Sequence, residues 1–152
     1  KDEDGVALVE FAVALPMMLV VFAVIIEGSR LMLAYQSTIA GVRDATRYLS
    51  RVLPAEICAS GGSVGTYTTQ LTAIVGQSVS GRSVLPSAVT LNSVTPSFAC
   101  VTGTYRVSPA AVATVSASIT VTYPFSGIFG LIGGSVPTVT TSVADSARVF
   151  GS

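Results

Sequence analysis

The chain has 152 residues, half of them hydrophobic, and its eight basic and eight acidic side chains give a net charge of zero. This length suits one domain with a membrane element, and the lack of a basic patch excludes nucleic acid as a partner. With no histidine and only two cysteines, the chain cannot complete a tetrahedral zinc site, and we expect neither a metal nor a cofactor.

Residues 6–26 form an apolar run that is interrupted by one acid, Glu10. A helix needs about 20 such residues to cross a bilayer, so the run predicts a membrane-spanning or filament-buried helix. A carboxylate there is costly unless it is paired or reaches the lipid headgroups, and position alone favours neither alternative. Pro16 removes a backbone donor, which predicts a kink or a weakened turn near Ala12.

Residues 27–53 change to an amphipathic pattern. Apolar or small side chains recur at spacings of three and four along one helical face, and polar side chains lie elsewhere on the wheel. The face comprises Leu31, Tyr35, Thr38, Val42, Ala45, Leu49 and Val52. We therefore predict a single long helix whose second half packs on a domain of residues 54–152. Gly28 and Gly41 are either close-contact points or tolerated weak positions.

The rest of the chain predicts loops, one short helix and three strands. Residues 53–65 suit a loop, and residues 66–79 fit either a helix or a strand, of which we favour the helix. Strands are expected over 88–95, 115–123 and 139–149. Asp145 in the last one suggests either a bulge or a polar contact, of which we favour the bulge. The predicted fold class is α+β, with the long helix packed on a small antiparallel sheet.

The connection over residues 125–134, FSGIFGLIGG, is unusually apolar. It suits either a segment tucked beneath the sheet or an exposed surface for a neighbouring subunit or lipid. We favour the buried position.

Cys58 and Cys100 are the only cysteines. An even pair that follows an export-type helix predicts a disulfide in an oxidising compartment, and two buried thiols are the weaker alternative. The pair encloses about 40 residues, for which the chain-entropy model gives about 4 kcal/mol of stabilisation.

Motifs that support catalysis are missing from the sequence. There is no Gly-x-Ser-x-Gly, no phosphate-binding loop and no dinucleotide fingerprint, and the only lysine is Lys1. Paired carboxylates would have to come from Glu27, Asp44, Glu56 and Asp145, and nothing in the sequence brings these acids together. The sequence therefore argues against an enzyme.

The amino-terminal motif resembles a known family. Gly5, four apolar residues, Glu10 and Phe11 resemble the prepilin-peptidase site of type IV pilin-like proteins, in which cleavage follows the glycine. The stretch LVEFAVALPMMLVVFAVIIEGSRLMLAYQ resembles the TadE-like pseudopilins of Tad (Flp-type) pilus systems, and VSASITVTYPFSGIFGLIGG is a second similarity. The segment KDEDG departs from the family, whose amino end usually carries Lys or Arg.

The resemblance implies a pilin-like subunit, a minor pilin or pseudopilin, that supports pilus biogenesis, adhesion and surface attachment. Residues 1–5 would be an N-terminal segment with processing between Gly5 and Val6, although Lys1 remains a possible mature terminus. Glu10, Phe11 and Pro16 would act in assembly, with a terminal amine as the partner of Glu10.

The same resemblance gives the expected location and partners. The protein would cross the inner membrane once, with a periplasmic domain, and would reach the pilus after assembly. Its partners would be prepilin peptidase, other pilin subunits and the Tad machinery. The alternative is a membrane-anchored extracytoplasmic binding module that never polymerises.

Overall fold

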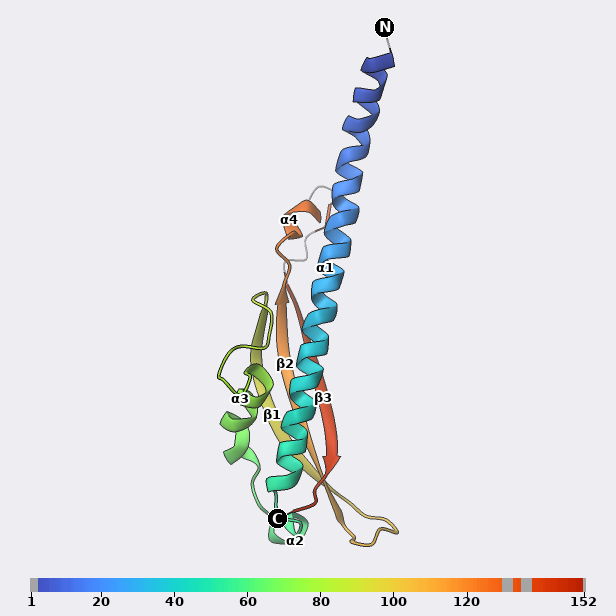
Figure 1. Ribbon diagram of the computed structural model, residues 1–152. Helices are drawn as coiled ribbons and strands as arrows, with labels where there is room; N and C mark the ends of the chain where they lie inside the picture. Colours follow the sequence, from blue (N-terminus) through green and yellow to red (C-terminus); the bar gives the residue numbers. More distant parts are fainter. Residues whose placement is uncertain (1–2, 130–132, 135–137, 152) are drawn as a thin grey trace.

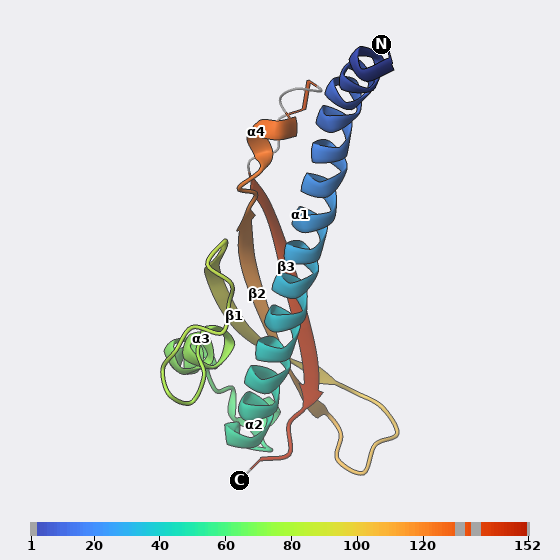
Figure 2. The same cartoon turned by 45° about the horizontal axis from the view of Figure 1, so that its top comes forward.

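The computed structural model describes residues 3–129, 133–134 and 138–151. Its main element is a helix of 50 residues, α1 (Glu3–Val52), which continues through Pro16. Figures 1 and 2 show that the carboxyl-terminal part of α1 lies along a sheet, whereas the amino-terminal part extends beyond it. The predicted single long helix is therefore present. Pro16 lies in an exposed part of α1 and does not end it, although its ring removes the backbone donor to Ala12.

The sheet has three antiparallel strands in the order β1-β2-β3. They are β1 (Val89–Val101), β2 (Ala110–Thr122) and β3 (Thr138–Arg148). The predicted α+β class, with a long helix on an antiparallel sheet, is confirmed. The first strand is much longer than the predicted range of 88–95, because Pro96 does not end it: β1 is an edge strand, where a proline can face away from the ladder.

The bulge predicted at Asp145 is wrong. Asp145 pairs in regular register with Val115, and the register shift lies in β1 between Leu91 and Ser93. β3 is an edge strand, so the half-buried Asp145 carboxyl needs no bulge to reach water. In β1 the extra residue is Asn92, whose side-chain amide donates to the Thr120 hydroxyl oxygen at 2.8 Å.

The core lies between α1 and the inner face of the sheet. Alternate residues of β2 are buried against it, including Val115 and Ile119, as the period-two pattern predicts. The predicted helix face is also confirmed, with Thr38, Val42, Ala45 and Leu49 fully buried and its other three members half-buried. The hydroxyl groups of Tyr35 and Thr141 share a hydrogen bond, which ties α1 to β3.

The segment after α1 contains short helices. The 53–65 region, predicted as a loop, includes α2 (Ile57–Ser60), and a 3-10 turn, η1 (Gly65–Tyr67), leads into α3 (Thr68–Gly76). The helix favoured within residues 66–79 is thus confirmed. Leu71 and Val75 of α3 are buried in the core.

The two glycines of α1 differ in their surroundings. A Cβ at Gly41 would lie 2.7 Å from the backbone oxygen of Val75, whereas one at Gly28 would meet nothing within 4 Å. Gly41 is therefore the close-contact point that lets α3 approach α1.

Cys58 and Cys100 form a disulfide, with their Cα atoms 5.8 Å apart. The bond joins α2, which follows the long helix, to the far end of β1. It therefore ties the loop region to the sheet, in the pairing that the sequence predicts.

Labelling of free thiols in the unreduced, denatured protein is expected to modify neither Cys58 nor Cys100. Reduction should expose both and lower the free energy of unfolding by about 4 kcal/mol, because the bond restricts the unfolded chain. The label is counted by intact mass, and the free energy is measured by denaturant titration with and without reductant. Two labelled cysteines before reduction would contradict the prediction.

The apolar connection after β2 does not tuck beneath the sheet where the structure describes it. Its first part forms α4 (Ser126–Phe129), which lies past the ends of the strands and beside α1 (Figures 1 and 2). The inner face of the sheet is already covered by α1 and α3, which leaves no room there. The preference for burial beneath the sheet is therefore wrong for α4, and residues 130–132 and 135–137 lie outside the described residues.

Candidate functional site: the exposed part of the long helix

Residues 5–22 of α1, here called the projecting segment, expose apolar side chains around the whole helix. Phe11 is 60% exposed, Met17 71% and Phe22 54%, and among these residues only Val20 is even half-buried. Soluble proteins rarely leave so large an apolar surface in water. The helix is long and apolar enough to cross a membrane, and only 6% of its most apolar stretch is buried within the chain. The segment requires lipid or other protein chains around it.

Every predicted processing and assembly residue lies on this segment. Gly5 and Val6 are exposed on the first turns of α1, and a Cβ at Gly5 would meet nothing within 4 Å. Glu10 is exposed and has no ion-pair partner within 4 Å among the described residues. Phe11 and Pro16 follow on the same exposed helix. A protease or a neighbouring helix could therefore reach this stretch without any rearrangement of the domain.

A second acid, Glu27, marks the point where α1 meets the domain. Its side chain is only 5% exposed, and its Oε1 atom accepts a hydrogen bond of 2.8 Å from the backbone N–H of Phe125. Its other oxygen, Oε2, is buried and has no hydrogen-bond partner among the described groups. A buried carboxylate is costly unless it is bonded, so this contact fixes the start of the apolar connection against α1.

Tyr123 lies in the same neighbourhood. Burial raises the pKa of the Tyr123 hydroxyl above its ordinary value, and the nearby Glu27 carboxylate and Tyr35 raise this pKa further. The hydroxyl therefore stays neutral at physiological pH. The Glu27 region is a polar contact between α1 and the connection, and it supplies no acid–base pair for catalysis.

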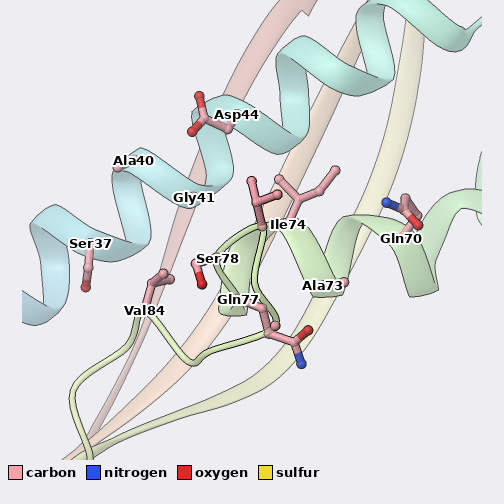
Figure 3. A pocket seen from close by; sticks show the side chains of 12 residues that line it. Ser37, Ala40, Gly41, Asp44, Gln70, Ala73, Ile74, Gln77, Ser78 and Val84 are labelled. Carbon is pink, nitrogen blue, oxygen red and sulfur yellow. The ribbon is translucent and has the colours of Figure 1, made fainter.

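A groove of about 940 Å³ lies between α1 and α3 (Figure 3). Its lining is mostly apolar and includes Ala40, Ile74 and Val84, with Asp44 as its one acid. Asp44 and Arg47 form an exposed ion pair with a separation of 3.7 Å, as their spacing predicts. The hydroxyl groups of Ser37 and Ser78 also belong to the lining of the groove.

The acids considered as catalytic partners are not brought together. Glu27 and Asp44 lie on different turns of α1, Glu56 precedes α2, and Asp145 is on β3. No cluster of three potential metal ligands is present among the residues that the structure describes.

Most of α1 matches the model of a known family. The model of the family described as TadE-like protein matches residues 5–47, which is most of α1. The match covers 43 of the 152 residues, so α1 is similar to this family. The match confirms the resemblance drawn from the sequence. No curated protein and no solved structure matches the chain.

The TadE-like match ends at residue 47, within the part of α1 that packs on the sheet. It therefore covers every residue predicted to act in processing or assembly, together with Glu27. Sequence reasoning missed the contact of Glu27 with the connection, although an acid directly after the apolar run, followed by Gly28, was a visible signal.

Proposed function

We propose that the chain is a structural subunit of a Tad/Flp-type pilus, a minor pilin or pseudopilin, that assembles through its apolar helix. The observation that carries the proposal is the projecting segment: a TadE-like helix, exposed on all sides and continuous with a folded domain. Lipid can surround such a segment, and so can a bundle of copies of itself. Passage between these two environments is what a filament subunit requires.

Before assembly, α1 would hold the protein in the inner membrane with its domain in the periplasm. The apolar run of residues 6–26 matches the thickness of a bilayer core. The disulfide between Cys58 and Cys100 supports an oxidising compartment for the domain. The amino end of α1 would then face the cytoplasm, where prepilin peptidase would cleave between Gly5 and Val6.

After cleavage, Glu10 would be the fifth residue of the mature chain. In a bundle of apolar helices its carboxylate needs a positive partner or a proton. The partner would be a cation of a neighbouring subunit. The assembled subunit would then support adhesion and surface attachment.

The second candidate function is a membrane-anchored binding module that does not polymerise. The groove between α1 and α3 favours it, because an apolar hollow of this size could receive a ligand or a peptide. In that case the projecting segment would remain in the bilayer, and no subunit would leave the membrane.

Fractionation of cells that express the full chain tests the proposal. Surface filaments are sheared off, and the protein is measured in the filament and membrane fractions with an antibody against the domain. We expect it in both fractions, and we expect deletion of its gene to reduce the yield of pili. Confinement to the membrane fraction, together with normal pili in the deletion strain, would support the anchored module instead.

A further inference from the structure

Glu10 and Arg30 are among the charged side chains of α1 that form no ion pair with the described residues. Glu10 is exposed and Arg30 is half-buried. The ion pair observed in the described part of the chain is Asp44–Arg47. Around Glu10 and up to Ile26 the exposed surface is apolar, so both charges lie at the ends of a region that excludes water once it is covered.

Their positions on the helix are related in a particular way. Glu27 points toward the domain, since it bonds Phe125. At 100° per residue, Glu10 lies about 100° to one side of Glu27 and Arg30 about 60° to the other. The two charges therefore flank the domain on nearly opposite sides of α1.

Parallel neighbouring helices bring opposite flanks of α1 into contact. When identical copies stand side by side with their domains outward, one flank of each helix contacts the other flank of the next. Glu10 and Arg30 are 20 residues apart, which is about 30 Å along the helix axis. A neighbour displaced by that distance would place its Arg30 level with Glu10.

We propose that Glu10 of one copy binds Arg30 of a parallel neighbouring copy that is displaced by about 30 Å along the helix axis. This inference rests on the proposed filament function and names a contact within it. A second copy of this chain would cover the flank of α1 that carries Glu10. Charge complementarity supports this, because the two opposite charges would meet at the same level and on facing flanks of the two helices. The guanidinium can bond both carboxylate oxygens, and the apolar surroundings strengthen the attraction.

The displacement of about 30 Å also indicates where along the membrane normal the contact would form. A bilayer core is about 30 Å thick, so Glu10 and Arg30 of a membrane-resident copy lie near its two faces. When one copy is lifted out by one bilayer thickness, its Glu10 reaches the level of Arg30 in a copy still in the membrane. The pair would therefore recruit each incoming copy at the outer face of the membrane.

The next cation along α1 fits less well. Arg43 lies only about 60° around the helix from Glu10, on the side facing away from the domain, so copies with outward-facing domains would not bring these two together. Glu27 is one turn from Arg30 in the same chain, but the two are not within ion-pair distance. The terminal amine of a cleaved chain would need a much smaller displacement than 30 Å, so experiment can separate it from Arg30.

A charge exchange tests the contact in cells whose only copy is the variant. Glu10→Arg and Arg30→Glu are each expected to lower the amount of subunit in sheared filaments by about tenfold or more, because each leaves like charges opposed. The double variant should recover most of the wild-type amount. Arg43→Glu is the matched control and should leave it unchanged. Membrane levels of all variants are measured in parallel to correct for insertion.

A cysteine pair provides a second measurement. Glu10→Cys and Arg30→Cys in one chain are about 30 Å apart, which is too far for a bond within the chain. Oxidation should instead link neighbouring copies, and the non-reducing gel should show a ladder that the Glu10→Cys, Arg43→Cys chain does not form. These cells also carry a wild-type copy, so that assembly continues.

The results separate this contact from the proposed function. If wild-type subunit is absent from sheared filaments, the filament function itself is wrong and the contact falls with it. If wild-type subunit is present but the charge exchange gives no recovery and the cysteine pair gives no ladder, the Glu10–Arg30 contact is overturned while the filament function stands. A defect confined to the Glu10 variants would assign the partner to the terminal amine and would also overturn it.

Discussion

Leu49→Asp is expected to unfold the domain or to lower its melting temperature sharply. Leu49 is fully buried where α1 meets the sheet, in the same core cluster as Val42 and Val115. The substitution removes an apolar side chain from this core and places a carboxylate there without a partner, which should cost several kcal/mol. A domain of this size has only about 5–15 kcal/mol of stability in total.

The measurement is thermal unfolding of the full chain in detergent, followed by circular dichroism. Met32→Asp is the matched control, because it makes the same kind of change on the same helix at a side chain that is 61% exposed. The control should melt close to the parent. A Leu49→Asp protein that melts with the parent would show that this face of α1 is not the core face.

The core face of α1 could be predicted because it depends on local spacing alone. Side chains three and four residues apart lie on one side of any helix, so Thr38, Val42 and Leu49 could be grouped before any partner was known. The same holds for the strand that became β2, whose alternation has a period of two. An antiparallel sheet was predicted, but the order of its strands, β1-β2-β3, was not.

The predictions were wrong where the structure depends on residues that are distant in sequence. Pro96 would interrupt a central strand, and only the position of β1 at the sheet edge makes it harmless. The apolar connection was expected beneath the sheet, but α1 and α3 already fill that face. The local sequence does not indicate which face of the sheet other elements leave uncovered.

The hydrogen-bond partner of Glu27 could not be predicted for the same reason. This partner, the backbone N–H of Phe125, is 98 residues away in sequence. A backbone donor carries no side-chain signature, so no spacing rule points to it. By contrast, Glu10 could be selected from sequence because its cost comes from the apolar residues on either side.

Glu10→Ala is expected to abolish or strongly reduce pilus assembly while membrane insertion and the folded domain remain intact. The side chain is exposed on the projecting segment, many residues before the core positions of α1, so its loss should not change the melting of the domain. Removal of a carboxylate from an apolar run should, if anything, favour insertion. In an assembled bundle, however, its cationic partner would be left buried without compensation, which is strongly destabilising.

The measurement is the yield of sheared pili from cells that carry only the variant, divided by the amount of subunit in the membrane. Val9→Ala, one residue away, is the control for a loss of side-chain volume in the same stretch, and it should give near-normal pili. The ratio matters because a plain membrane anchor predicts no defect at all: an anchor gains from the loss of a charge and has no assembled state to lose. Normal pili at normal subunit abundance would therefore remove Glu10 from the assembly mechanism and favour the anchored binding module.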